Sequence, residues 1–385
     1  MRNKPRLELT PPNVNIAILS LGSNKGDRGD FIAQAVSQTQ QFVGTVVRVS
    51  GLYESDAWGF DGAPFYNAAI AIHTKKSAQD VLAGILQIEQ SLGRTREGQG
   101  YSERTIDIDL IAFNNEVIST DGLKVPHPLM HQRQFVLLPM RDLNIDWNHP
   151  QSGKSIPELL AESGDGSECV RVGKLDSPLD RYPLQRYNYI AIEGNIGAGK
   201  TTLTNRIAAD FNAKTVLERF ADNPFLPKFY EDQPRYAFPL EMSFLADRYQ
   251  QIADDLAQFD LFKDFIVADY HIFKSLIFAK VTLSEDEYRL YKKLFDIIYR
   301  EMPKPDLYVY LYQNTERLLQ NIRTRGRSYE QEIPAQYLEQ INQGYLDYIK
   351  SQQNLNVLMI DVSELDFVKN QEDYITILEA IRTRL

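Results

Sequence analysis

The chain has 385 residues, of which 43% are hydrophobic and 24% are charged, and its formal net charge is −10. This length is sufficient for two or three domains, and the composition is typical of a globular protein. Acidic residues are spread along the whole chain, which argues against a general nucleic-acid-binding surface. Any anionic ligand must therefore be held locally, by short clusters of Arg, Lys and backbone amides.

Several observations on the sequence bear on where the protein works. No apolar run approaches the ~20 residues that a membrane-spanning helix needs. The first residues, "MRNKPRLELTPPN", lack the apolar segment of a secretory signal, and the one cysteine, Cys169, cannot form an internal disulfide. We therefore expect a cytoplasmic protein that acts on small molecules and has neither nucleic acid nor a membrane as a partner.

Strands and helices alternate in the first part of the chain. Apolar alternation predicts strands in "NIAILSLGSN", "FYNAAIAIH" and "RTIDIDLIAF", and helical spacing predicts helices in "GDFIAQAVSQTQQFV" and "SAQDVLAGILQIEQSLG". The predicted order is strand, helix, strand, strand or hairpin, helix, strand, which favours an α+β domain in which a sheet carries helices on one face.

Two carboxylates stand two residues apart in the third of these strands. The side chains of Asp107 and Asp109 are therefore expected to point to the same face, where they could share divalent ions. Arginines occur on both sides of the pair, which indicates a metal-bound polyphosphate. The alternative is a solvated salt-bridge network on a sheet face.

Six ordered motifs of this region resemble the hydroxymethyldihydropterin pyrophosphokinase family of the folate pathway. They are "LSLGSNKGDR", "YESDAWG", "FYNAAIAI", "IEQSLGRTR", "RTIDIDLIAFNNEVI" and "VPHPLMHQRQFVLLPM", and the resemblance extends from about Asn15 to Glu162. It implies a ferredoxin-like α+β fold. It also implies that ATP donates its terminal two phosphates together to the pterin hydroxymethyl group, leaving AMP.

The same resemblance implies roles for individual residues. Asp107 and Asp109 would hold two magnesium ions. The residues implied for ATP are Glu89, Arg94, Arg96, Arg104, His127 and Arg133, with Arg96 and Arg104 taken as catalytic. The residues implied for the pterin are Ser55, Ala57, Trp58, Phe65, Asn67 and Phe135, the two Phe rings enclosing the flat heterocycle. His127 could instead be a core histidine.

A change in composition and in the pattern of predicted elements divides the chain. Residues 163–186 are rich in Gly, Ser, Asp and Pro and are predicted to form a linker between a domain at 1–162 and a domain at 187–385. After the linker, long helical stretches alternate with the buried-type strands "YIAIEG", "DFIVADY", "DLYVYLY" and "LNVLMID". Such runs predict an α/β domain with a parallel sheet covered on both faces.

The stretch "YIAIEGNIGAGKTTL" matches the phosphate-binding pattern G-x-x-x-x-G-K-[ST]. It follows a predicted strand and precedes a predicted helix, as a phosphate-binding loop requires. Lys200 is expected to reach the outer phosphates, and Thr201 to hold magnesium. A glycine-rich turn without a ligand is the alternative, but it does not account for the Lys and Thr. The predicted ATP-binding residues are Gly194, Asn195, Ile196, Gly197, Ala198, Gly199, Lys200, Thr201 and Thr202.

The segments after this P-loop resemble the deoxynucleoside kinase family from Tyr187 to about Leu385. The motifs are "LERFADNPFLPKFYED", "FPLEMSFLADRY", "DYHIFKSLIFA" and "RTRGRSYE", and the resemblance is strongest to bacterial deoxyguanosine and deoxyadenosine kinases. It implies that Glu218 is the general base for the sugar 5′-hydroxyl, although a strand-end acid on the surface is the alternative. It further implies that Arg325 and Arg327 are lid arginines, and that Tyr230 and Glu330 hold the sugar 3′-hydroxyl.

Two positions depart from the family pattern. Glu241 stands where many members have a glutamine that reads the base. A carboxylate accepts only, so it suits the adjacent N1–H and amine donors of guanine, and Arg248 on the same helical face could meet O6 and N7. The alternative is that Glu241 merely pairs with Arg248.

The second departure is "DYH", beginning at Asp269, where "ERS" or "DRS" would supply an arginine. Asp269 could still organise magnesium or the nucleoside, and we count it among the nucleoside-binding residues. The missing arginine leaves the phosphate site one cation short unless Arg323 compensates. Arg323 stands beside the usual lid position, which Asn321 fills.

The sequence thus predicts two ATP- and Mg²⁺-dependent enzymes on one polypeptide. One would be a pterin pyrophosphokinase for folate synthesis, and the other a salvage kinase for purine deoxynucleosides that favours deoxyguanosine and forms a homodimer through the kinase domain. Two rival hypotheses are that one half is an inactive nucleotide sensor, and that the second half is an ATPase that drives a partner.

Overall fold

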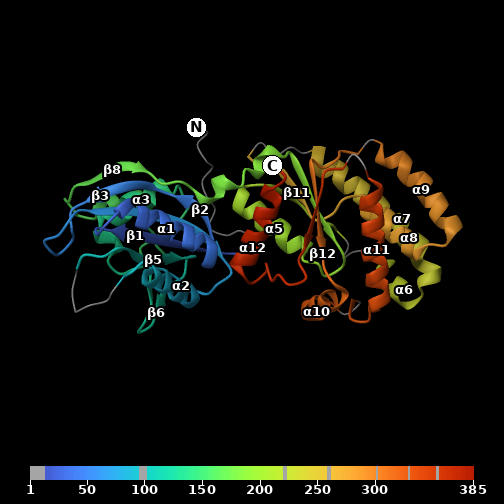
Figure 1. The fold of residues 1–385 in the computed structure, drawn as a ribbon, viewed down its shortest axis with the longest axis horizontal. Helices are drawn as coiled ribbons and strands as arrows, with labels where there is room; N and C mark the ends of the chain where they lie inside the picture. The colour runs from blue at the N-terminus through green and yellow to red at the C-terminus, as the bar shows by residue number, and fades with distance from the viewer. Residues whose placement is uncertain are drawn as a thin grey trace. The chain divides into compact units, whose positions relative to one another are not determined.

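We analysed a computed structural model of the chain, which describes residues 14–94, 102–219, 223–257, 262–300, 302–327, 330–352 and 355–385. The chain divides into two compact units (Figure 1). The first comprises Met1–Tyr182 with Lys369–Ile375, and the second comprises Pro183–Val368 with Thr376–Leu385. No helix in the described ranges is long and apolar enough to cross a membrane.

The first unit is built on a six-stranded sheet with the order β5-β1-β4-β3-β8, in which β2 also pairs with β4 and the described pairs are antiparallel. Its strands are β1 (Asn15–Ser23), β2 (Thr45–Val49), β3 (Gly51–Ser55), β4 (Phe65–Thr74), β5 (Asp107–Phe113) and β8 (Cys169–Lys174). A small hairpin joins β6 (Ile118–Ser119) and β7 (Lys124–Val125). The predicted order of strands and helices up to β5 is confirmed.

Helices cover both faces of this sheet. Alternate residues of β1 belong to different cores, because Leu19 packs with α1 (Arg28–Phe42) and α2 (Ala78–Ser91), whereas Ile18 packs with α3 (Gln134–Asp142) and α4 (Ile156–Glu162). The two helices predicted from their spacing, α1 and α2, lie on one face as expected, but α3 and α4 cover the other, so the prediction of a single covered face was wrong. Both pairs of helices have an apolar stripe, and the stripe alone does not specify which side of the sheet it covers.

The segment predicted to be a linker is largely structured. Cys169–Lys174 forms β8, which pairs antiparallel with β3, and short 3₁₀ helices follow at Pro178–Arg181 and Leu184–Arg186. The prediction of a linker over the whole of 163–186 was wrong at β8. Backbone pairing with β3 holds this strand. Its two valines, Val170 and Val172, are exposed, so the strand has no buried apolar face that would identify it in the sequence.

The second unit has a five-stranded parallel sheet with the order β10-β11-β9-β12-β13. Its strands are β9 (Tyr189–Gly194), β10 (Lys214–Val216), β11 (Ile266–Ala268), β12 (Leu307–Tyr312) and β13 (Val357–Asp361). Its helices are α5 (Lys200–Phe211), α6 (Leu226–Glu231), α7 (Gln233–Ala257), α8 (Phe273–Thr282), α9 (Glu285–Tyr299), α10 (Thr315–Arg325), α11 (Ala335–Ser351) and the part of α12 (Gln371–Arg382) that begins at Thr376. The predicted parallel sheet is confirmed.

The strands of the second sheet point their carboxyl ends toward the phosphate-binding loop. Tyr189 and Ala191 of β9 pack in a core with residues of α7, α8 and α11, while α5 packs against β9, β10 and β11. In an open parallel sheet, ligands bind beyond the carboxyl ends of the strands. We therefore expect the segments after β9, β10 and β11 to form a ligand-binding site.

Candidate functional sites

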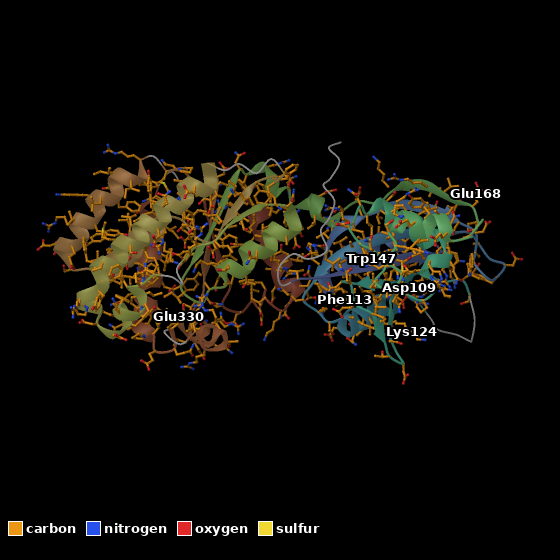
Figure 2. All side chains as sticks on the ribbon, turned by 180° about the vertical axis from the view of Figure 1, so that it is seen from behind. Asp109, Phe113, Lys124, Trp147, Glu168 and Glu330 are labelled. Carbon is orange, nitrogen blue, oxygen red and sulfur yellow. The ribbon has the colours of Figure 1, made fainter. Side chains whose placement is uncertain are left out.

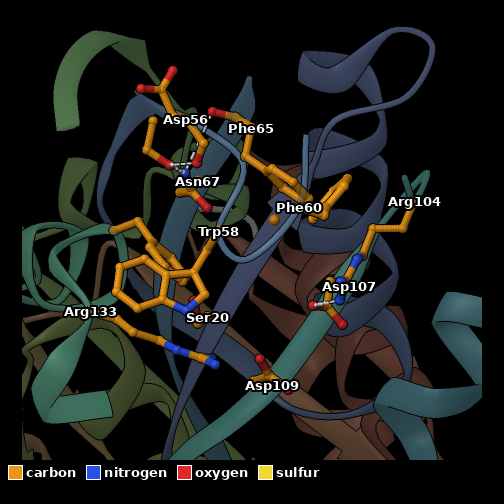
Figure 3. A pocket seen from close by; sticks show the side chains of 13 residues that line it. Ser20, Asp56, Trp58, Phe60, Phe65, Asn67, Arg104, Asp107, Asp109 and Arg133 are labelled. Carbon is orange, nitrogen blue, oxygen red and sulfur yellow. Dashed lines mark hydrogen bonds and ion pairs between the residues drawn. The ribbon is translucent and has the colours of Figure 1, made fainter. Parts of the chain in front are cut away.

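The first unit contains a pocket of about 530 Å³ at one end of its sheet (Figure 3). The residues that line it are Ser20, Gly22, Ser55, Asp56, Trp58, Phe60, Phe65, Asn67, Arg104, Asp107, Asp109, Arg133 and Phe135. Five of the six residues predicted for the pterin are among them; Ala57 is not. Phe60 and Asp56 were missed, although Asp56 lies within the motif "YESDAWG" and Phe60 follows it directly.

Strand register gathers the polar residues of this pocket. Gly22 of β1 pairs with Asn67 of β4 on one side and with Asp107 of β5 on the other, and Ser20 pairs with Asp109. Asp107 and Asp109 line the same pocket, as residues two apart in a strand do. Three neighbouring strands thus bring an amide and two carboxylates to one cavity.

The two carboxylates have different surroundings. Asp107 forms ion pairs with Arg94, at 2.5 Å between Nη1 and Oδ1, and with Arg104 (Figure 3). Burial, together with the negative charges of Asp107 and Glu89, raises the pKa of Asp109 to about 7, against the opposing charges of Arg133 and Arg94. A divalent cation between the two aspartates would favour their ionised forms.

Glu89, Arg94 and His127 do not line the pocket. The buried Glu89 accepts from the backbone N–H of Ile108 at 2.8 Å and forms an ion pair with Arg94. Arg94 in turn forms an ion pair with Asp107. His127 is half-buried rather than a core residue, and its Nδ1 accepts from the backbone N–H of Leu129 at 3.3 Å. Burial lowers its pKa, so the neutral ring keeps a proton on Nε2 that can be donated. Arg96 lies outside the described residues.

Aromatic side chains and arginines form the rest of the wall. The ring centroids of Trp58 and Phe135 are 6.1 Å apart, and the guanidinium of Arg133 lies 5.6 Å from the Phe135 ring. Across the pocket, Arg104 lies 5.8 Å from the ring of Phe65. Asn67 donates from Nδ2 to Ser55 Oγ at 3.0 Å, which leaves its carbonyl oxygen for a ligand. Such a wall suits a flat heterocycle with a polar edge.

The second unit has a pocket of about 830 Å³ beside its phosphate-binding loop. The residues that line it are Ile196, Gly197, Lys200, Thr201, Glu218, Leu226, Phe229, Tyr230, Leu240, Glu241, Phe244, Arg248, Asp269, Lys274, Phe278, Arg325, Arg327, Glu330 and Tyr337. All eight side chains predicted for nucleoside binding or catalysis in this half are among them, and Glu330 is marked in Figure 2. Gly194, Asn195, Ala198, Gly199 and Thr202 do not line it.

The loop between β9 and α5 has the conformation of a phosphate cradle. Gly197 and Gly199 have φ of 84° and 85°, values that only glycine adopts without strain, and Gly199 caps α5. The ammonium of Lys200 donates to the carbonyls of Gly194 and Asn195, each at 2.9 Å. Burial, together with the like charge of Lys274, lowers the pKa of Lys200 to about 8. A bound polyphosphate would oppose that effect.

Glu218 follows β10 and lies between two buried cations. Arg248 Nε lies 2.8 Å from Oε1 and Lys274 Nζ lies 2.6 Å from Oε2. Burial alone would raise the pKa of Glu218, but the charges of Lys274 and Arg248 outweigh it and hold the pKa well below its usual range. Glu218 is therefore ionised in the folded protein, and it is not the exposed acid of the alternative interpretation.

Asp269 connects the phosphate-binding loop to Glu218. Its Oδ2 accepts from the Thr201 hydroxyl at 2.5 Å, and its Oδ1 accepts from the backbone N–H of Glu218 at 2.7 Å. Parallel pairing of β11 with both β9 and β10 brings these segments together at one edge of the sheet.

Glu241 and Arg248 do not pair with each other in the described ion pairs. Arg248 instead binds Glu218, and its Nη1 donates to Ser275 Oγ at 2.7 Å. Glu241 Oε1 accepts from the Thr282 hydroxyl at 3.1 Å, while Oε2 is buried without a hydrogen-bond partner in the described part of the chain. An acceptor in that state indicates that a donor from a ligand completes it.

The lid arginines converge on one acid. Arg325 forms an ion pair with Glu330 Oε2, and Arg327 Nη1 lies 3.3 Å from Oε1. Arg323 is exposed and does not line the pocket, so the prediction that it compensates for the missing arginine is not supported. Asn321 instead donates to the carbonyl of Gly197 at 2.9 Å. The additional cation in the pocket is Lys274, which sequence reasoning missed.

The donor sets fit magnesium shared with a substrate. In the described ranges no group of three or more Asp, Glu, His or Cys side chains could enclose a metal. Mg²⁺ usually takes only one or two protein carboxylates and completes its shell with water and phosphate oxygens. The pair Asp107 and Asp109 matches that requirement, and so does the carboxylate of Asp269 beside the hydroxyl of Thr201.

Comparison with known proteins also divides the chain into two parts. Residues 18–145 match the family model described as 7,8-dihydro-6-hydroxymethylpterin-pyrophosphokinase, and residues 190–385 match that of the deoxynucleoside kinases. Deoxyguanosine kinase of Bacillus subtilis is 40% identical over 190 residues, which are 48% of this chain and 92% of that protein. Deoxyadenosine/deoxycytidine kinase of the same organism is 29% identical over 210 residues, 53% of this chain and 95% of that protein.

The first half has relatives of its own. The 2-amino-4-hydroxy-6-hydroxymethyldihydropteridine pyrophosphokinase of Bacillus subtilis is 39% identical over 170 residues, which are 44% of this chain and 96% of that protein. Both halves thus match nearly the whole length of relatives that are transferases. The chain belongs to two families: its first half is a member of the hydroxymethylpterin pyrophosphokinases, and its second half is a member of the deoxynucleoside kinases.

Proposed function

We propose that the first unit transfers the terminal two phosphates of ATP to the hydroxymethyl group of 6-hydroxymethyl-7,8-dihydropterin, a step of folate synthesis. The observation that carries this proposal is one cavity that joins an aromatic wall and Asn67 to the pair Asp107 and Asp109. The wall accommodates the pterin ring and Asn67 meets its polar edge, so that the hydroxymethyl group lies toward the carboxylates.

The charged residues of this unit would act on the triphosphate. Magnesium held by Asp107 and Asp109 would supply Lewis-acid stabilisation of the phosphate oxygens. Arg104 and Arg133 line the cavity from opposite sides and would bind phosphate oxygens by charge-assisted hydrogen bonds. Arg94 forms ion pairs with both Glu89 and Asp107 and would keep the Asp107 carboxylate in place. Arg96 and His127 are proposed for ATP as the family resemblance implies.

The second unit, we propose, transfers the γ-phosphate of ATP to the 5′-hydroxyl of a purine deoxynucleoside, with deoxyguanosine favoured. The observation that carries this preference is Glu241 Oε2, which is buried in the pocket without a partner among the described residues. An ionised carboxylate there can accept both N1–H and the amine of guanine. A relative named deoxyguanosine kinase, 40% identical, supports the same choice.

The phosphoryl-transfer groups surround the opposite end of this pocket. The backbone amides from Gly194 to Thr202 and the ammonium of Lys200 would hold the β- and γ-phosphates, and Thr201 would hold magnesium. Glu218 would accept the proton of the 5′-hydroxyl. Arg325 and Arg327 would spread the charge of the transferring group, and Tyr230 and Glu330 would hold the 3′-hydroxyl.

One turnover experiment tests both proposals. The purified chain is given ATP and Mg²⁺ with the dihydropterin, deoxyguanosine, deoxyadenosine, deoxycytidine or thymidine in turn, and AMP and ADP are measured separately. We expect AMP with the pterin and ADP with deoxyguanosine above the other nucleosides. A preference for a pyrimidine would contradict the role of Glu241, and ADP formed equally well without any nucleoside would favour the ATPase hypothesis.

Oligomeric state and location are separate proposals. A homodimer through the kinase domain rests on family resemblance, and sedimentation of the purified chain tests it. A cytoplasmic location is supported by the shared need for ATP, and fractionation of cells that express the tagged chain tests it.

A further inference from the structure

Lys274 lies in the kinase pocket, and although it belongs to the motif "DYHIFKSLIFA", no role was predicted for it from the sequence. It is the second residue of α8, and its side chain is 9% exposed. Its ammonium lies 2.6 Å from Glu218 Oε2. Burial of a lysine is costly unless an anion compensates the charge, so that the position of Lys274 depends on Glu218.

The two oxygens of Glu218 are used differently. Oε1 lies 2.8 Å from Nε and 2.7 Å from Nη2 of Arg248, so that both of its acceptor sites are taken. Oε2 accepts from Lys274 alone among the described residues. It therefore keeps one acceptor site for a hydroxyl of a molecule in the pocket.

We propose that Lys274 is a positioning residue for phosphoryl transfer, which holds Glu218 Oε2 so that its remaining acceptor site faces the 5′-hydroxyl of the nucleoside. In the step that this serves, the hydroxyl oxygen forms a bond to the γ-phosphorus of ATP and its proton passes to Oε2. The bond from that phosphorus to the β–γ bridging oxygen breaks, and ADP leaves. The role rests on the proposed kinase function of this unit.

Lys274 also accounts for the cation that the segment after β11 lacks. Where "DRS" would place an arginine, this chain has the fully buried Tyr270, which does not line the pocket. Lys274 supplies a positive charge to the same pocket from the first turn of α8. Its charge acts on Lys200 as well, since it contributes to the lowered pKa of that lysine.

Steady-state kinetics of Lys274→Met and Lys274→Arg test the proposal. In Lys274→Met we expect kcat to fall about 100-fold, because a misplaced reacting group costs that much, with little change in KM for ATP or nucleoside. Lys274→Arg should recover much of kcat, because it keeps the charge and the donors. Lys280→Met is the matched control, since Lys280 lies on the same helix but is exposed and outside the pocket.

A double mutant distinguishes a positioning role of Lys274 from a merely structural one. In Glu218→Gln the base is absent, so adding Lys274→Met should cost little further activity. Unchanged kcat in Lys274→Met, additive losses in the double mutant, or KM increases that Lys274→Arg does not reverse would each overturn the role. If Lys274→Met does not fold, Lys274→Gln replaces it with the same expectation. A wild-type chain without nucleoside turnover overturns the proposed function itself, whereas an active wild type with an insensitive Lys274 overturns only this role.

Discussion

From the titration of Glu241 we predict a preference for the base that depends on pH. Its pKa is raised to about 7, mainly by burial and also by the charge of Glu218, while Arg248, Thr282 and Lys274 act in the opposite direction. Below that pH the side chain is protonated and offers one donor and one acceptor, which match N1 and the amine of adenine. Above it the ionised side chain matches guanine. Between about pH 6 and pH 8 we expect kcat/KM for deoxyguanosine relative to deoxyadenosine to rise at least about 10-fold.

Glu241→Gln provides the control for this titration. An amide presents a donor and an acceptor at every pH, so the variant should prefer deoxyadenosine and its preference should not change with pH. A wild-type ratio that stays constant over the same range would show that Glu241 does not read the base edge.

Asp109 predicts which activity depends on the paired carboxylates. Asp109→Asn removes the negative charge that would hold magnesium, and we expect AMP formation with the pterin to fall at least about 100-fold, since loss of a group that only orients a metal ligand already costs 10–100-fold. Deoxynucleoside-dependent ADP formation should not change. Asp121→Asn, at an exposed turn of the same unit, is the control. Full pterin activity in Asp109→Asn would contradict the metal site.

Single contacts of the kinase pocket could not be predicted from the sequence. The partners of Glu218 are 30 and 56 residues away along the chain, and no local pattern relates them. Resemblance identified the pocket-lining acids and arginines, because each lies in a motif. It did not show that Arg248 binds Glu218 rather than Glu241, or that Lys274 completes the site.

At the scale of elements, the junction of β9 and α5 makes a prediction about stability. A Cβ at Gly199 would lie 2.6 Å from Cζ of Phe367, and φ there is 85°. At Gly326, after α10, φ is 74° but no atom lies within 4 Å. Alanine at Gly326 should cost about 1–2 kcal/mol from the left-handed backbone alone. Alanine at Gly199 should cost about 1–3 kcal/mol more because of the clash.

Thermal unfolding of the two variants of the full chain measures this difference. We expect the transition of the second unit to shift more in Gly199→Ala than in Gly326→Ala. Equal shifts would mean that the Phe367 ring moves aside freely and that backbone conformation alone requires the glycine.

Elements with a strong local signal were predicted correctly, and those held by distant pairing were not. The P-loop and its flanking β9 and α5 follow from glycine spacing and apolar runs. β8 was missed because its backbone pairing with β3, more than 100 residues earlier, stabilises it without an apolar face of its own. The placement of α3 and α4 on the second face of the sheet likewise depends on chain topology rather than on local sequence.

For the whole molecule, the structure predicts that the two activities are separable. The residues that line the first pocket lie between Ser20 and Phe135, and those that line the second lie between Ile196 and Tyr337. Glu218→Gln should lower deoxynucleoside turnover about 10²–10⁴-fold, the usual worth of general base catalysis. Its pterin turnover should equal that of the wild type. Loss of both activities in a folded variant would contradict independent sites, and an inactive half in the wild type would favour the sensor hypothesis.

One peptide chain carries both pockets, so a cell makes and degrades them in equal number. Expression cannot change the ratio of the two capacities; only changes in kcat, KM or inhibition of one site can. A mutation that unfolds either unit and exposes the chain to proteolysis should remove both products from metabolism, even though we predict that the two sites work separately. The joined units thus have independent chemistry and a shared lifetime.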